Sequence, residues 1–278
     1  MTLSWLESIV YGLISGLTQI IPVSADAHRL LLMKVFGVAG EPQLMGLLVH
    51  IAGLAAVYFA CQTHIVKLMR ARSLSKVPKR RRKRPLDTKS LMDISLWKTM
   101  LLPVILGFFF YEKAQSLAGN LILVACFLFV NGLILYIPQF LPGSNKDSRS
   151  LSRVEGVLMG LGGALSVIPG MSGIGAAVSV GSVCGVDRSY ALNMSLLMSL
   201  GIHVGYLVFD VMALVSAGIG GVGLTLILQC LAAAAAAFLG TTLGIRVMRS
   251  MAKNMGFSLL GYYSWGLALF TFILNLMA

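Results

Sequence analysis

The chain has 278 residues, of which 57% are hydrophobic and 12% are charged, and its mean hydropathy is +0.86. Soluble domains carry about 25% charged residues, so this composition excludes an ordinary soluble protein and indicates an integral membrane protein. The formal net charge is +12, and about half of the cations lie in one stretch, residues 67–89.

Six apolar runs are long enough to cross a membrane. In a bilayer core every backbone amide needs an internal hydrogen-bond partner, so each run is predicted to be a helix of about 20 residues. The runs lie near residues 43–62, 91–110, 119–137, 189–215, 222–243 and 256–277.

Two further apolar stretches, residues 8–34 and 154–186, are interrupted by helix-breaking and polar residues. These are Pro22, Ser24, Asp26 and His28 in the first, and Gly170, Ser172, Gly173 and Gly175 in the second. Irregular backbone at membrane depth is tolerated where it is buried in protein or lines a wet cavity. Both stretches are therefore predicted to be re-entrant helical hairpins, which makes the fold an all-α integral membrane bundle.

The basic stretch predicts the orientation of this bundle. Cationic loops stay in the cytoplasm, so the loop 63–90 is predicted to be cytoplasmic, and counting crossings places both termini outside a multi-pass plasma-membrane protein. Beside a bilayer, attraction to anionic lipid headgroups explains the cations better than nucleic acid does, and no nucleic-acid partner is expected. A homodimer is compatible with the sequence but is not indicated by it.

Each interrupted stretch is followed by three crossings, which suggests an internal repeat with halves 1–140 and 150–278. The cores GLTQIIPVS (Gly16–Ser24) and GALSVIPGMS (Gly163–Ser172) are similar, although Ile, Pro, Gly and Ser are common enough in membranes for coincidence. Because three is odd, the second unit would enter the membrane inverted. The two hairpins would then meet near the middle, where transporters of this kind bind their substrates.

Four motifs carry a resemblance to a known family. TQIIPVSADAH (Thr18–His28) and PGMSGIG (Pro169–Gly175) resemble the two signature motifs of the undecaprenyl-diphosphate phosphatases, the bacitracin-resistance proteins, and LLVHIAG (Leu47–Gly53) and GVDRSYA (Gly185–Ala191) resemble the stretches that follow them. The resemblance implies six crossings with two inverted re-entrant hairpins. It also implies removal of the terminal phosphate from a C55 polyprenyl diphosphate, which recycles a lipid carrier for cell-wall synthesis.

The catalytic residues of that family are largely replaced in this sequence. Ser15 and Gln19 stand where the family has two glutamates, and Gly173 stands where it has an arginine. Loss of a positioned acid or base costs about 10²- to 10⁴-fold in rate, and loss of an arginine on a transferring phosphoryl group costs about 10³- to 10⁵-fold. Efficient hydrolysis is therefore not expected.

The residues assigned to the site follow from these motifs. If hydrolysis survives, the catalytic candidates are Ser24, Asp26 and His28, with Asp26 as a sparse ligand for Mg²⁺ or Ca²⁺, whereas binding alone requires no cofactor. The predicted substrate-binding residues are Ser15, Gln19, Arg29, Gly170, Ser172, Gly173, Gly175 and Arg188.

Structural alternatives stand beside several of these assignments. The serines and Asp26 could cap helices, Arg29 could extend toward headgroups, and Arg188 could anchor an interface. His50, His203 and Asp210 lie on predicted spanning helices and rank lower, as packed polar groups. The glycines and Ser172 favour an anion site made by helix N-terminal amides, which needs no cationic side chain.

Three functions are compatible with this site. The leading hypothesis is a member of this family that binds a polyprenyl phosphate or diphosphate with weak or no hydrolysis and is able to translocate it. The second is an active phosphatase that uses Asp26, His28 and Ser24, and the third is a secondary transporter of a small anion.

Overall fold

The computed structural model describes residues 3–82, 84–141, 145–218, 223–254 and 256–277, and within these ranges it is helical without a named β-strand. Six of the described helices are long and apolar enough to cross a membrane. They are α3 (Gln43–Ser75), α4 (Thr88–Phe108), α6 (Leu121–Tyr136), α9 (Arg188–Ala217), α10 (Leu224–Asn254) and α11 (Ser258–Met277). The predicted all-α integral membrane fold with six spans is thereby confirmed.

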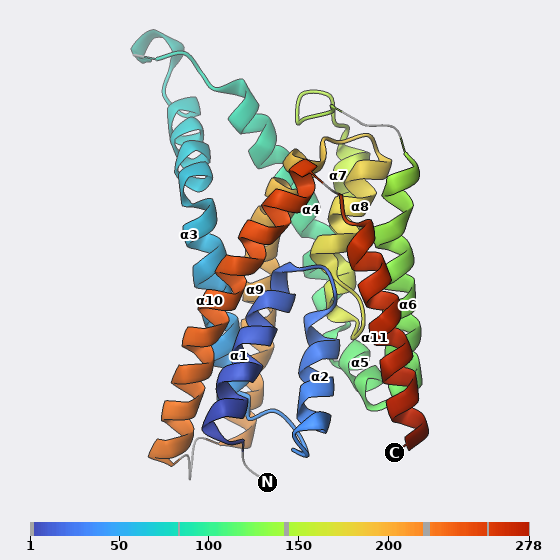
Figure 1. Cartoon of the computed structure of the whole chain (residues 1–278). Helices are drawn as coiled ribbons and strands as arrows, with labels where there is room; N and C mark the ends of the chain where they lie inside the picture. Colours follow the sequence, from blue (N-terminus) through green and yellow to red (C-terminus); the bar gives the residue numbers. More distant parts are fainter. Residues whose placement is uncertain (1–2, 83, 142–144, 219–222, 255, 278) are drawn as a thin grey trace.

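The two interrupted stretches form pairs of short helices. In the first half α1 (Trp5–Ile20) turns into α2 (Ala25–Val35), and in the second half α7 (Arg153–Ala164) turns into α8 (Gly173–Val183). Figure 1 shows the α1–α2 turn reaching into the bundle from the end that carries the termini, and the α7–α8 turn reaching in from the other end. Each pair is a helical hairpin; that the hairpins are re-entrant in a bilayer, as inverted repeats, stays a prediction.

Short helices complete the chain. They are α5 (Tyr111–Gln115) and the 3₁₀ turns η1 (Lys79–Arg81), η2 (Ser116–Gly119), η3 (Ile137–Phe140) and η4 (Leu165–Val167).

The breaks are narrower than the sequence suggested. The first is residues 21–24, so Asp26 and His28 lie within α2 and do not interrupt it. Gly173 and Gly175 likewise lie in the first turn of α8. The physical reason is capping: the hydroxyls of Ser24 and Ser172 accept amide protons of the following turn, which starts each helix directly after the break.

Matching caps also begin the two hairpins. Ser4 with Glu7 starts α1, and Ser152 with Glu155 starts α7, each as a reciprocal capping box. The two halves thus share the same order of elements: a capped hairpin followed by three long helices.

Small residues allow the first hairpin to pack closely on α10. A Cβ atom placed on Gly12 would lie only 2.0 Å from the carbonyl oxygen of Ala233, and one on Gly16 would lie 2.1 Å from that of Ala237. The four-residue spacing on both helices is the small-xxx-small pattern that brings membrane helices into backbone contact. This packing holds α1 against α10, the longest helix of the second half.

The basic segment differs from the predicted loop 63–90, because α3 continues through its first half to Ser75. Lys and Arg are good helix formers and need no burial. The helix α3 therefore has a total length of 33 residues, about 50 Å. Arg82 closes this helix by donating to the carbonyl oxygens of Val77 and Ser75. Figure 1 shows α3 standing beyond the other helices at the end opposite to both termini.

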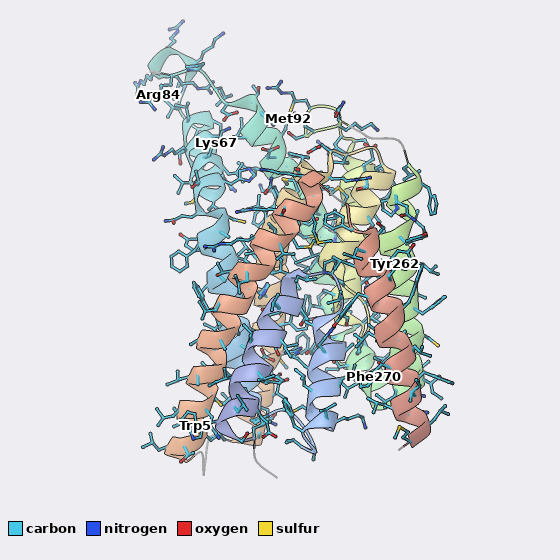
Figure 2. All side chains as sticks on the ribbon, viewed as in Figure 1. Trp5, Lys67, Arg84, Met92, Tyr262 and Phe270 are labelled. Carbon is cyan, nitrogen blue, oxygen red and sulfur yellow. The ribbon has the colours of Figure 1, made fainter. Side chains whose placement is uncertain are left out.

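Large apolar side chains cover the outside of the bundle. Phe59 is 60% exposed, Leu102 is 58% exposed and Leu269 is 62% exposed, which water-soluble proteins avoid over such continuous areas. In Figure 2 charged Lys67 and Arg84 lie at one end and Trp5 lies near the other. The protein is therefore a multi-pass membrane protein with apolar sides; which end faces the cytoplasm stays a prediction.

Candidate functional site

The two hairpin tips touch. The backbone amide of Gly170 donates to the Ser24 hydroxyl at 3.0 Å, and a Cβ atom on Gly175 would lie 2.4 Å from the Cβ of Pro22. Ser24 has φ +67°, the one positive φ of a non-glycine residue in the described ranges. Such strained backbone persists where neighbours hold it, and here the strained residue joins the hairpins.

Asn131 of α6 ties the same two tips together. Its amide donates to the Pro22 carbonyl at 3.0 Å and to the Ser264 hydroxyl at 3.2 Å, and its oxygen accepts from the Ser172 amide at 3.0 Å. The side chain is fully buried. A single amide thus satisfies backbone groups that both breaks leave without helical partners.

A small cavity of about 40 Å³ lies beside this junction and is called the inner cavity below. Both hairpin tips, α3 and α9 line it, with Gln19, Asp26, His50, Ser166, Ser172, Gly173, His203 and Tyr206 among its residues. This volume has room for a few water molecules. The predicted pocket between the hairpin tips is thus present as a small polar space.

A hydroxyl of the inner cavity has no protein partner. The Oγ atom of Ser166 is buried without a hydrogen bond to any described residue. Such groups are costly in a low-dielectric interior unless a ligand or water satisfies them. The α8 N-terminus, beginning at Gly173, also borders the cavity and favours negative charge.

The Gln19 side chain depends on a glycine for its position. The Gln19 carboxamide lies 3.3 Å from Nε2 of His203. Nδ1 of His203 donates to the Ser199 carbonyl at 2.7 Å, so Nε2 accepts, and it pairs with the NH₂ group of Gln19. A Cβ atom on Gly53 would lie 2.0 Å from this carboxamide. Only glycine at this point of α3 leaves room for the Gln19–His203 contact.

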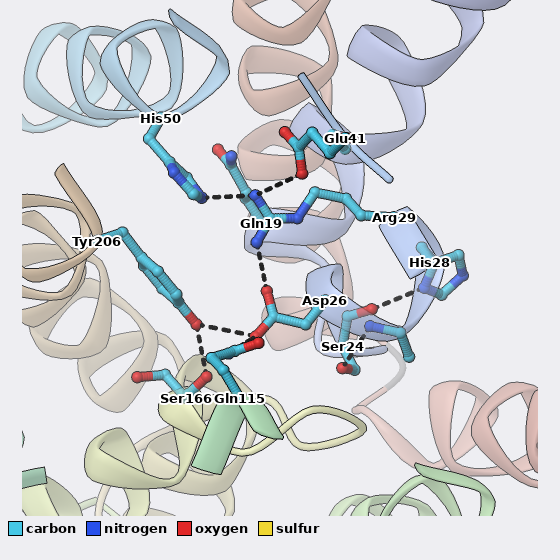
Figure 3. Close-up of polar contacts among 12 residues, drawn as sticks. Gln19, Ser24, Asp26, His28, Arg29, Glu41, His50, Gln115, Ser166 and Tyr206 are labelled. Carbon is cyan, nitrogen blue, oxygen red and sulfur yellow. Dashed lines mark hydrogen bonds and ion pairs between the residues drawn. The ribbon is translucent and has the colours of Figure 1, made fainter. Parts of the chain in front are cut away.

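An ionic cluster separates the inner cavity from a wider pocket. Asp26 and Arg29, one turn apart on α2, form an ion pair. The second oxygen of Asp26 accepts from Gln115 at 2.9 Å and from Tyr206 at 3.4 Å. Figure 3 shows Arg29 and Tyr206 converging on this carboxylate. Each oxygen of Asp26 therefore has a protein donor.

Arg29 also contacts groups on its other side. Its Nη1 lies 3.0 Å from Nε2 of His50 and 3.9 Å from Glu41, and Nδ1 of His50 lies 2.6 Å from Asp210. The wider pocket lies on this side of Arg29. It has a volume of about 410 Å³ and is named the outer pocket. It is lined by residues that include Asp26, Arg29, Lys34, Glu41 and Gln115.

His28 faces away from both polar spaces. Its Nδ1 lies 2.7 Å from the Ser24 carbonyl and its Nε2 lies 2.8 Å from the Tyr263 hydroxyl. A carbonyl oxygen only accepts, so Nδ1 carries the proton and Nε2 accepts from Tyr263. Figure 3 shows His28 and Asp26 pointing to different sides of α2. His28 lines an apolar groove of about 470 Å³ between α1, α2 and α11.

The structure thus brings together some of the predicted site residues and separates others. Gln19, Asp26, Ser172 and Gly173 line the inner cavity, and Arg29 lines the outer pocket. The other predicted site residues line neither the inner cavity nor the outer pocket. Ser15 is buried on α1, and Ser24, Gly170 and Gly175 take part in the contact between the hairpin tips. His28 lines the apolar groove, and Arg188 lies beside Gly256. The three catalytic candidates therefore do not converge on one point.

The residues present do not fit a divalent metal. Such ions take several oxygen ligands, whereas both oxygens of Asp26 are already occupied. No group of three or more His, Cys, Asp or Glu side chains that could hold a metal occurs within the described part of the chain. No chemical step is assigned to a metal here.

Several residues of the site were missed or ranked low in the sequence. Ser166, Gln115 and Tyr206 were not singled out, and His203 was ranked as a packed polar group. A signal was available on α9, where Ser199, His203, Tyr206 and Asp210 follow one another at three- and four-residue steps. That spacing places polar groups along one face of a spanning helix, where they usually face a partner or a cavity.

Comparisons with known proteins cover almost the whole chain. The family model described as bacitracin resistance protein BacA matches residues 8–270. The undecaprenyl-diphosphatase of Methanobrevibacter smithii is 27% identical over 96% of both chains, and undecaprenyl-diphosphatase 1 of Shouchella clausii is 24% identical over 98% of this chain and 96% of its own. The undecaprenyl-diphosphatase of a Nocardioides species is 30% identical over 74% of both chains. The chain therefore belongs to the BacA family of bacitracin resistance proteins, the family of the undecaprenyl-diphosphatases.

Proposed function

We propose that this protein binds the headgroup of a polyprenyl phosphate or diphosphate between its hairpin tips, hydrolyses it weakly or not at all, and passes it across the bilayer. The observation that carries the proposal is the Ser166 hydroxyl, which is buried without a partner beside the α8 N-terminus at the inner cavity. Phosphate oxygens are strong acceptors and would accept from this hydroxyl and from the first amides of α8. The lipid class follows from the printed names of the relatives.

The two polar spaces suit successive stages of headgroup binding. The outer pocket offers the Arg29 guanidinium and is ten times larger than the inner cavity. The inner cavity offers the Ser166 hydroxyl and the α8 N-terminus. A headgroup would be captured outside and then admitted when the Asp26–Arg29 wall moves, which is the alternating exposure that transport requires.

The apolar groove suits the lipid tail. It is lined largely by aliphatic and aromatic side chains of α1, α2 and α11, so a lipid tail would find in it surroundings as apolar as those of the bilayer core. Thr18 lines both the groove and the inner cavity. A lipid could therefore keep its tail in the groove while its headgroup lies between the hairpins.

Weak hydrolysis is supported by the state of the catalytic candidates. The Asp26 carboxylate is occupied by Arg29, Gln115 and Tyr206, so it is not placed to bind a metal or to activate water. Ser24 accepts two amide protons, and His28 is held by groups on the far side of α2. General acid–base catalysis needs a group within hydrogen-bond reach of the reacting atoms.

The experiment is a binding assay with the full chain in lipid nanodiscs and a fluorescent short-chain polyprenyl phosphate. Ser166→Ala should weaken binding about tenfold or more, since a hydrogen bond to a charged group contributes about 1.5–3 kcal/mol. Ser179→Ala is the matched control, because Ser179 Oγ is equally buried and unpartnered but does not line the cavity.

A phosphate-release assay in the same nanodiscs decides between binding and catalysis. With Mg²⁺ or Ca²⁺ and a polyprenyl diphosphate, we expect release far below the range of about 1–10³ s⁻¹ that is usual for enzymes. Release within that range, abolished by Asp26→Ala or His28→Ala, would establish the active phosphatase instead. Equal binding by the wild type and Ser166→Ala would remove the inner cavity from the proposal.

A further inference from the structure

His50 occupies a position in which its protonation state follows from its partners. The Nη1 atom of Arg29 lies 3.0 Å from Nε2 of His50. A guanidinium group has donors and no acceptor, so Nε2 must accept and carries no proton. Nδ1 then carries the proton and donates to Asp210 at 2.6 Å. While Arg29 stays in place, His50 is a neutral imidazole.

The surrounding charges make a second proton favourable once Arg29 leaves. Asp26, Glu41 and Asp210 bring three carboxylates to a cluster with one guanidinium, a formal charge of −2 with His50 neutral. The His50 side chain is 3% exposed and that of Arg29 is 11% exposed, so water screens these charges weakly. A vacated Nε2 would therefore face a net negative environment, with the Asp210 carboxylate fixed at the other end of the ring.

An anionic headgroup has two ways to reach Arg29, and both free His50. A phosphate in the outer pocket or in the inner cavity competes with His50 Nε2 for the guanidinium, and phosphate is the stronger acceptor. A phosphate that approaches a cluster of net charge −2 is also repelled by it. Uptake of one proton by the cluster lowers that repulsion, so headgroup binding and proton binding favour each other.

We infer that His50 is a proton-binding site coupled to headgroup capture, because Arg29 and a proton compete for the same lone pair on Nε2. This inference rests on the proposed headgroup binding. When the guanidinium moves to the phosphate, Nε2 takes a proton from solvent, and the imidazolium formed pairs with Asp210. When the headgroup leaves, Arg29 returns to Nε2 and the proton is released. Each headgroup would thus carry one proton through the cycle.

Other titratable groups also face His50 and define the background of any measurement. On α9, Tyr206 stacks on the His50 ring with centroids 4.8 Å apart, and His203 lies within electrostatic reach. The cluster itself contributes Asp26, Arg29, Glu41 and Asp210, and Tyr11 of α1 and Tyr111 of α5 lie within electrostatic reach of Arg29. Tests must therefore isolate His50 by substitution.

The first test needs no lipid. Histidine-selective ¹⁵N NMR of the full chain in nanodiscs, assigned with His50→Gln, reports whether each ring nitrogen carries a proton. We expect Nε2 of His50 to carry no proton at pH 7 in the wild type, and to carry one under the same conditions in Arg29→Met. Lys34→Met is the charge-matched control, since Lys34 lines the outer pocket without contacting His50. An unchanged protonation state of His50 in Arg29→Met would overturn the competition.

The second test measures protons taken up on binding. Farnesyl phosphate is titrated into the protein by calorimetry at pH 8, in buffers of different ionisation enthalpy. We expect the wild type to take up about one proton more per headgroup than His50→Gln; using the difference removes the contribution of the phosphate itself. His64→Gln should behave as the wild type, because His64 pairs with Asp93 away from the two pockets.

The outcomes separate the two proposals. Binding with equal proton uptake in the wild type and His50→Gln overturns the coupling and leaves headgroup binding standing. Absence of binding in every variant overturns headgroup binding and with it the coupling, while the NMR measurement still decides whether Arg29 controls the proton on His50.

Discussion

Replacement of Asn131 by leucine should loosen the contact between the hairpins. Leucine has nearly the shape of asparagine but cannot form the three hydrogen bonds that Asn131 makes to Pro22, Ser172 and Ser264. Hydrogen bonds between membrane helices contribute about 0.6 kcal/mol each on average and up to about 1.7. Loss of all three therefore predicts a decrease of about 2–5 kcal/mol in the free energy of unfolding.

Two measurements check this value. Reversible unfolding of Asn131→Leu in mixed micelles gives the change in free energy, and hydrogen exchange of the Ser172 amide reports whether the second hairpin tip has lost its partner. Gln139→Leu is the control, because Gln139 is exposed in η3, the 3₁₀ turn that follows α6; it should change the free energy by less than about 0.5 kcal/mol. Unfolding and Ser172 exchange that match the wild type in Asn131→Leu would refute the role of Asn131 as the link between the tips.

Two further predictions concern other parts of the chain. Gly173→Arg introduces the residue type that the family has at this position, and it should destabilise the protein without activating it. The reason is steric, because a Cβ atom at residue 173 would lie 2.5 Å from the carbonyl oxygen of Gly163. A raised rate of phosphate release without a fall in melting temperature would contradict this prediction. Replacing the three cations of residues 79–81 by glutamine should weaken binding of the protein's basic end to anionic vesicles by about 3 kcal/mol, roughly 100-fold, at about 1 kcal/mol per cation near the surface. Vesicle co-flotation of a peptide spanning residues 63–90 measures this, and equal binding of the glutamine peptide would exclude an electrostatic contact.

Local sequence rules predicted the main elements correctly. The six spans follow from apolar length alone, and the two breaks follow from Pro22 and from the glycines around Ser172. The predicted end of α3 was wrong, because the end of the apolar run does not end the helix: helix propensity continues through Lys and Arg to Ser75.

The candidate site was predicted less completely, and the reason is geometric. Asp26 and His28 were treated as members of one irregular segment, in which both could face the same space. The structure makes that segment the first turn of α2, and side chains two positions apart on a helix do not share a face. Asp26 therefore faces the inner cavity and pairs with Arg29, and His28 faces the apolar groove with Tyr263.

The sequence by itself thus determined the class of protein, the number of crossings and the positions of the breaks, because these depend on residues that are neighbours in the chain. Only the tertiary structure decided that Arg29 of α2 meets His50 of α3 and, through it, Asp210 of α9. These residues are far apart in sequence, and their contact depends on how three helices are rotated and packed. No local pattern records that rotation, since it is fixed by the close fit of side chains along the whole length of each helix.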